Sequence, residues 1–226
     1  MRMIKIAALV ALLAPSLAIG SAVAGPFVYS GYDVVNNQSV SLSGPGGFNE
    51  VGGSGQIILH GTGPSAGVNI LAWCIDVLHW LQGSGTYTFN SSPSNNGTNP
   101  PTPAAAALST VTIGQIGALI AYGNAHINDS YDISSGTQIA IWTTEYAGLG
   151  YSFLGSPGAN ATASALLALL PSLTPDHSWL ALTSKDSQGL VTNQSLAIQV
   201  PEPGALGLLG AGLLGIGLLR RRGKTD

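Results

Sequence analysis

Positive charge is almost absent from most of this sequence. Asp, Glu, Lys and Arg together make up only 8% of its 226 residues. Between Gly25 and Gln199, Lys185 is the only lysine or arginine and faces eight acidic residues, so the formal charge of this segment is −7 (one minus eight). Nucleic acids and anionic membrane surfaces attract proteins through lysine and arginine, so this charge excludes both as partners of the segment.

Cysteine is nearly absent as well. The one cysteine, Cys74, lies in the stretch AWCIDVLHW. A single cysteine cannot form an intrachain disulfide, so no disulfide framework stabilises the fold. The His, Cys and acidic residues lack the close spacing of metal ligands, and we expect no metal and no cofactor. In an oxidising compartment an unpaired thiol is open to oxidation, so the role of Cys74 depends on where the protein is located.

The N-terminus has the three parts of a secretory signal peptide. Arg2 and Lys5 form a basic region, residues 6–13 form an unbroken apolar run, and residues 22–24 (Ala-Val-Ala) form a small-residue cleavage site. The apolar run is too short for an anchor helix. We therefore expect residues 1–24 to be a signal peptide that is removed on export.

The C-terminus combines an extended motif, an apolar segment and a basic end. Residues 204–219 are uncharged and apolar, and we expect them to form a single transmembrane helix. A helix of this length spans about 24 Å, less than the hydrocarbon core of about 30 Å, but local thinning of the bilayer accommodates the difference. The flanking residues are Val200, Pro201, Glu202 and Pro203 before the helix, and Arg220, Arg221, Arg222 and Lys224 after it.

Taken together, residues 200–226 resemble the PEP-CTERM sorting signal. The resemblance implies that an exosortase, a membrane-embedded cysteine protease or transpeptidase, recognises and removes this tail. It also implies a Gram-negative bacterium that makes extracellular polysaccharide. The protein is then exported, anchored transiently in the inner membrane, and released to the cell surface or the extracellular matrix. A permanent tail anchor would explain the helix and the arginines, but not the PEP motif.

The remaining segment, residues 25–199, is long enough for one domain with a hydrophobic core. Short β-branched and aromatic runs separated by Gly, Asn and Ser predict strands between residues 27 and 75 and at 85–90. Residues 91–107 are rich in Pro, Asn and Ser, which is typical of a surface loop. Helices are expected at 112–123, 135–150 and 159–173, and strands at 178–184 and 190–200. The expected fold is α+β, a β-rich sandwich or barrel-like body with a helical insert at about 112–173.

One pair of segments indicates a function for Cys74. Trp73-Cys74-Ile75 is followed, 64 residues after the cysteine, by Thr137-Gln138-Ile139-Ala140-Ile141-Trp142. This combination resembles the paired signature of bacterial surface thioester domains, also called TQxA domains. Trp73 departs from the pattern, in which Tyr, Phe or Leu is usual.

The resemblance implies a thioester between Cys74 and Gln138 that captures an amine- or hydroxyl-bearing target on a surface or polysaccharide. Such a bond is consumed when it reacts, so the protein would not be a turnover enzyme. We expect Gln138 in the first turn of a helix capped by Ser134 or Ser135, where backbone N–H groups would stabilise the oxyanion. Residues expected around the thioester are Trp73, Thr137, Ile141 and Trp142, with Trp80 and Tyr146 as further candidates for a wall that excludes water.

Two other functions remain open. The protein could be a non-covalent structural or carbohydrate-interacting matrix component in which Cys74 is a reduced core residue. It could also be a secreted cysteine hydrolase that pairs Cys74 with a histidine, although the four histidines show no pattern. If Cys74 to Trp80 were one strand, Asp76 would share the face of Cys74, and His79 would point away.

Overall fold

The structure is a computed structural model that describes residues 25–90, 108–189 and 191–200. The predicted signal peptide at 1–24, the surface loop at 91–107 and the C-terminal helix at 204–219 lie outside these residues. Within the described ranges, no helix has both the length and the apolar character needed to cross a membrane.

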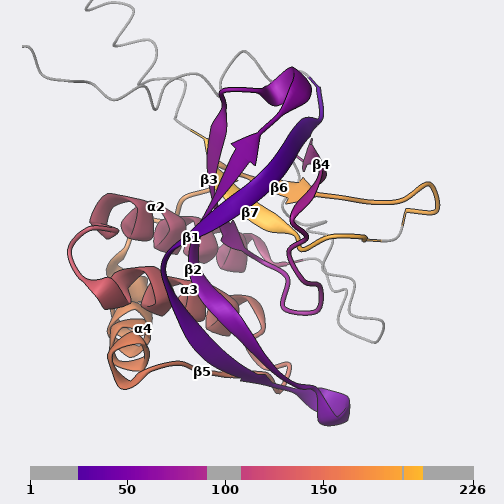
Figure 1. Cartoon of the computed structure of the whole chain (residues 1–226). Helices are drawn as coiled ribbons and strands as arrows, with labels where there is room; N and C mark the ends of the chain where they lie inside the picture. Colours follow the sequence, from indigo (N-terminus) through magenta and orange to yellow (C-terminus); the bar gives the residue numbers. More distant parts are fainter. Residues whose placement is uncertain (1–24, 91–107, 190, 201–226) are drawn as a thin grey trace, which may run out of the picture.

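A long antiparallel hairpin begins the fold (Figure 1). It consists of β1 (Phe27–Ser43) and β2 (Asn49–Gly61), joined by the 3₁₀ turn Pro45–Gly47. The sequence predicts two short strands where β1 is one continuous strand of 17 residues. The interruption that the sequence indicates is an irregularity in the pairing, between Val35 and Gln38, and not a break in the strand.

All strand pairings in the described residues are antiparallel. The series of paired strands that starts at β2 ends next to β1, which also pairs with β2. The order is β2-β3-β7-β6-β4-β1-β5, with β1 also paired to β2. The strands form a ring that is not a barrel, because the ring closes only through β1. The first four residues of β1 pair with β4, and most of the strand pairs with β2. The other strands are β3 (Asn69–Cys74), β4 (Ser84–Asn90), β5 (Ser152–Leu154), β6 (Trp179–Thr183) and β7 (Leu196–Gln199).

Among the described residues, three α-helices lie between β4 and β6 in the chain, where the helical insert is predicted. They are α2 (Thr110–His126), α3 (Tyr131–Glu145) and α4 (Pro157–Leu169). Figure 1 shows them side by side next to the strands. The α+β class is confirmed, and the short strand β5 interrupts the helical part. The prediction that α3 starts near Ser135 is wrong by four residues, because Ser130 is the N-cap and α3 begins at Tyr131.

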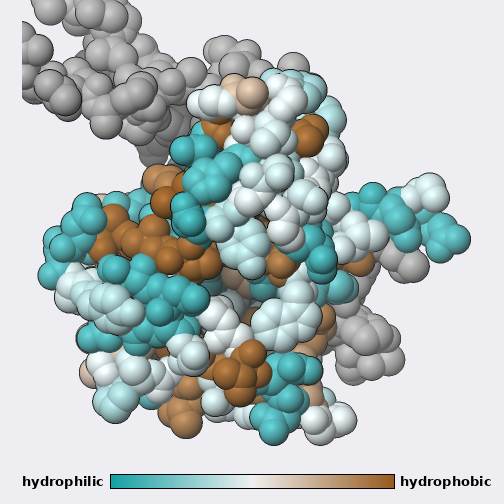
Figure 2. Space-filling view, viewed as in Figure 1, coloured by the Kyte–Doolittle hydropathy of each residue, from teal (hydrophilic) through white to brown (hydrophobic). Residues whose placement is uncertain are grey.

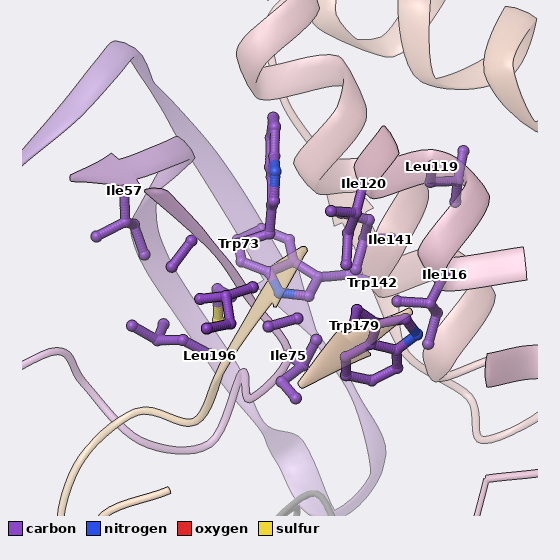
Figure 3. Close-up of a cluster of buried hydrophobic side chains, with 14 of the residues drawn as sticks. Ile57, Trp73, Ile75, Ile116, Leu119, Ile120, Ile141, Trp142, Trp179 and Leu196 are labelled. Carbon is purple, nitrogen blue, oxygen red and sulfur yellow. The ribbon is translucent and has the colours of Figure 1, made fainter. Parts of the chain in front are cut away.

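The hydrophobic core lies between the strands and the helices (Figure 3). Trp73 and Trp179 are the largest fully buried side chains and come from β3 and β6. They pack in one cluster with apolar residues of α2 and α3. Burial of these large apolar surfaces drives the helices onto the sheet.

On the face shown in Figure 2, hydrophobic residues gather in a band at the left, where Figure 1 draws α2, and hydrophilic residues cover much of the rest. The exposed large hydrophobic residues of the described chain are spread over many elements, among them Val51 of β2, Leu71 of β3 and Val111 of α2. Singly exposed apolar residues are usual on soluble proteins and need no ligand to explain them.

Candidate functional site

The structure brings Cys74 and Gln138 together. Cys74 is the last residue of β3, and Gln138 lies in the middle of α3. The backbone N–H of Cys74 donates a 2.9 Å hydrogen bond to Gln138 Oε1, and Gln138 Nε2 donates a 2.8 Å hydrogen bond to the Cys74 carbonyl. One donor and one acceptor on each side fix the orientation of the carboxamide, because a flipped amide would make neither bond.

This contact forms where β3 changes its partner. β3 pairs with β2 as far as Ala72, and it then pairs with β7 through Trp73 and Cys74. The N–H of Ile75 donates a hydrogen bond to the carbonyl of Ser195, the residue before β7, so the N–H and C=O of Cys74 point to the opposite side. There the Gln138 carboxamide takes the place of a neighbouring strand and satisfies both backbone groups.

Two serines in the first half of α3 attach the helix to the β1–β2 hairpin. Ser134 Oγ accepts a 2.8 Å hydrogen bond from the N–H of Gln56 and donates one of 2.5 Å to the Val35 carbonyl. Ser135 Oγ is hydrogen-bonded to Ser54 Oγ. The sequence predicts one or the other of these serines as the N-cap of the helix, but the N-cap is Ser130. Both serines bond to strands instead and thereby aim Gln138 at Cys74.

All of the predicted thioester residues lie in one buried site. Cys74 is 3% exposed and Gln138 is 1% exposed. The residues predicted to surround them are also buried: Trp73, Thr137, Ile141 and Trp142. Of the two further candidates for the wall, Tyr146 is buried, but Trp80 is 52% exposed and does not belong to it. The site is therefore closed to bulk water.

The carbonyl oxygen of Gln138 has a donor, although not the predicted one. Gln138 is the eighth residue of α3 and lies outside its first turn. N–H groups in the middle of a helix are used within the helix and cannot stabilise an oxyanion. The prediction of donors in the first turn is wrong. The donor to the carbonyl oxygen of Gln138 is the backbone N–H of Cys74.

The Cys74 thiol is turned toward the next residues of its own chain. Sγ donates a 3.2 Å hydrogen bond to the Asp76 carbonyl and accepts one of 3.3 Å from the Asp76 N–H. Desolvation raises the pKa of the thiol well above its usual value, and the Trp142 indole, close to the sulfur but outside hydrogen-bonding geometry, lowers it only partly. The thiol is thus protonated at neutral pH.

The four histidines make no hydrogen bond with Cys74 in the described structure. β3 ends at Cys74, so Asp76 and His79 belong to the loop that follows and not to a strand. His79 Nδ1 lies 2.7 Å from Asp76 Oδ2, which raises the pKa of His79. A strand that continued from Cys74 to Trp80 would point His79 away from Asp76, but the chain turns after β3 and brings the two side chains together.

Glu145 is the residue of this site that sequence reasoning missed. It is 7% exposed, and neither of its carboxyl oxygens has a hydrogen-bond partner among the described residues. Its spacing from Gln138, seven residues along one helix, places both on one helix face. That spacing was the available signal, but a glutamate near the end of a helix normally faces solvent.

The C-terminal tail starts directly after the folded domain. The N–H of Val200, one residue after β7, donates a 2.8 Å hydrogen bond to the Ser178 carbonyl. The sequence that follows is matched by a known signal. Residues 199–222 match the PEP-CTERM protein-sorting motif.

The PEP-CTERM motif identifies a protein that is exported, processed by an exosortase at the membrane and sorted to the cell surface. The matched range contains the predicted motif residues Val200, Pro201, Glu202 and Pro203 and the basic residues Arg220, Arg221 and Arg222. No curated protein and no solved structure matches the chain. The comparisons thus support the sorting signal and give no support to the resemblance to thioester domains.

Proposed function

We propose that this PEP-CTERM protein attaches covalently to its surroundings through a thioester between Cys74 and Gln138. The target would be an amine or hydroxyl group on the cell surface or in the polysaccharide matrix. The observation that carries the proposal is the pair of hydrogen bonds between the Gln138 carboxamide and the Cys74 backbone, inside a buried site.

The reaction needs a small rearrangement of this pair. The thiol rotates about its Cα–Cβ bond, away from Asp76, and attacks the side-chain carbonyl carbon of Gln138. The sulfur–carbon bond forms, the carbon–nitrogen bond breaks, and Nε2 leaves as ammonia with the thiol proton. The N–H of Cys74 already binds Oε1 and remains in place to stabilise the oxyanion.

Burial gives the thioester a lifetime long enough to be useful. A thioester hydrolyses when water reaches it, and a closed apolar site delays this until a nucleophile enters. Trp73 and Trp142, both at least 97% buried, would form the wall of this site. The ectodomain has a single lysine, Lys185, so its own surface offers few amines to compete for the bond.

Intact mass spectrometry of the purified ectodomain, residues 25–200, tests the proposal. The wild type should be lighter than its sequence by one ammonia, and methylamine should add to it. Cys74→Ala and Gln138→Ala should have the full mass expected for their sequences and should not react with methylamine. Gln82→Ala, which changes an exposed glutamine away from the site, is the matched control and should behave as the wild type.

A second candidate function is that of a non-covalent structural component of the matrix, with Cys74 reduced. The two hydrogen bonds of the thiol with Asp76 and its raised pKa favour this candidate, because both are typical of inert buried cysteines. In that case the ectodomain has its full mass, and denaturation exposes one titratable thiol.

A further inference from the structure

The folded domain ends where the sorting motif begins. The last strand, β7, ends at Gln199, which is also the first residue matched by the PEP-CTERM motif. The N–H of Val200 still donates a 2.8 Å hydrogen bond to the Ser178 carbonyl. The Pro-Glu-Pro sequence at 201–203 follows directly, so the sequence leaves no linker between the domain and the peptide that the exosortase reads.

The side chain of Gln199 fixes this junction from two sides. Its Oε1 accepts a 2.9 Å hydrogen bond from Asn124 Nδ2, and its Nε2 donates one of 3.2 Å to Asp176 Oδ2. Oδ1 of Asp176 in turn accepts hydrogen bonds from the N–H of Ser178, at 2.7 Å, and from its hydroxyl, at 2.5 Å. These bonds tie the end of β7 to α2 and to the segment that precedes β6.

β7 cannot lengthen the tail by leaving the sheet without a large cost. It is an interior strand, paired with β6 on one side and with the end of β3 on the other (Figure 1). Three of its four residues, Leu196, Ala197 and Ile198, are fully buried, so detachment would expose apolar surface to water. It would also remove the strand partner of Cys74. The exosortase therefore meets this tail on a folded domain.

The reach of the tail from the domain is short. Four peptide units join Val200 to Gly204, where the apolar segment begins, and fully extended they span about 14 Å. A domain the size of residues 25–199 has a radius of gyration of about 16 Å. An enzyme that binds residues 201–203 thus has to approach the folded surface from which the tail leaves until the two are in contact.

This junction surface consists of Asp176, His177, Ser178 and Val200. His177 is exposed, and the other three are half-buried. Lys185 is the only lysine or arginine of the ectodomain, and it follows the opposite end of β6. Anionic lipid head groups are bound through lysine and arginine. The junction surface therefore suits contact with a protein and not with an anionic membrane surface.

We propose that the exosortase docks on the junction surface of the folded ectodomain while it binds the PEP motif. The substrate then has two parts, a short peptide and a folded surface beside it. Binding of one part holds the other close to the enzyme, so the two contacts together bind more tightly than either alone. The inference does not depend on the thioester, and Cys74→Ala should be processed at the wild-type rate.

A linker insertion tests the proposal in the full chain. About ten Gly and Ser residues, followed by a valine that preserves the Val-Pro-Glu-Pro sequence, are inserted between Val200 and Pro201. In cells that contain the exosortase, conversion of the full chain to its shortened form is followed over time. Because the insertion separates the peptide from the junction surface, processing should slow at least about tenfold. Processing at the wild-type rate or faster would overturn the proposal.

The same insertion between Gly46 and Gly47 is the matched control. These residues are exposed and lie in the turn that joins β1 and β2, so the distance from the junction surface to the PEP motif does not change. This variant should be processed at the wild-type rate. If both insertions slow processing equally, the delay comes from the added residues, and docking is ruled out.

Photocrosslinking tests the contact directly. A photoreactive amino acid replaces His177 in the full chain, and the exosortase carries alanine in place of its catalytic cysteine, so that uncleaved substrate accumulates on it. Mass spectrometry should identify exosortase peptides in the crosslinked product. The same amino acid in place of Val51, a 65% exposed residue of β2, is the control and should give none. Crosslinks from position 177 to lipid alone, or to nothing, would overturn the proposal.

Discussion

The indole N–H of Trp73 donates a 2.9 Å hydrogen bond to Oδ1 of Asn124. The same oxygen accepts a 2.7 Å bond from Gln56 Nε2, and Asn124 Nδ2 donates to Gln199 Oε1 at 2.9 Å. One side chain of α2 thus connects β2, β3 and β7 at the point where β3 leaves β2. This network fixes Trp73 next to Cys74.

Replacement of Asn124 by leucine should destabilise the ectodomain strongly. The buried N–H of Trp73 and the amide of Gln56 would lose their acceptor, and we expect a loss of about 2–4 kcal/mol in the free energy of unfolding. Urea unfolding of both proteins measures this. Asn124→Asp keeps the accepting oxygen and should cost less. Equal losses in the two variants would show that the accepted hydrogen bonds are unimportant.

Gly55 is needed for the contact between α3 and the hairpin. Its φ is +150°, and a Cβ there would lie 2.6 Å from the Val35 carbonyl oxygen and 2.8 Å from Ser134 Oγ. Gly55→Ala should therefore lower the free energy of unfolding by about 2–3 kcal/mol. Because Ser134 positions the helix that carries Gln138, closure of the proposed thioester, followed by the loss of one ammonia in the intact mass, should slow as well.

Gly46→Ala is the control for Gly55→Ala. Gly46 also has a positive φ, +70°, but a Cβ would have nothing within 4 Å. This variant should cost only the backbone strain, about 1 kcal/mol. A loss as large as that of Gly55→Ala would show that the contact with α3 is not the cause.

The burial of Glu145 predicts a pH-dependent stability. Its pKa in the folded state lies well above that in the unfolded state, so the folded state binds more protons between the two values. The wild type should therefore lose about 1.4 kcal/mol of stability per pH unit relative to Glu145→Gln, starting near pH 4.5 and ending at the folded pKa. Urea unfolding from about pH 4 to 7 measures the difference. A constant difference would show that Glu145 ionises normally.

His79 should titrate above its usual range because its ring is hydrogen-bonded to Asp76. The pair stabilises the fold fully below about pH 6.5, and this contribution is lost as the pH rises through the raised pKa of His79. Asp76→Asn should lower the pKa of His79, as followed by the NMR shifts of its ring protons. His60, bound to Asp33 and Asn69, is an internal control whose titration should not change. An unchanged titration of His79 would contradict the assignment of its partner.

The local pattern predicted the order of the elements well. Strands occur before residue 75 and after 178, and the helices fall between them, because β-branched runs and helical spacing act over a few residues. The boundaries were less accurate, most clearly at α3. Its first turn contains Asp132 but few apolar residues, so the periodic signal starts one turn after the helix does.

By itself, the sequence determined the sorting of the protein, because the PEP-CTERM signal is a linear motif that an enzyme reads as a peptide. It also indicated the pair Cys74 and Gln138. Only the tertiary structure decided that the two meet through the Cys74 backbone, and that Asp76 holds the thiol. It also decided that Glu145, at the end of the same helix, is buried without a hydrogen-bond partner among the described residues. These contacts depend on where β3 leaves β2 and on how α3 is docked, and such long-range packing is not encoded in any short stretch of residues.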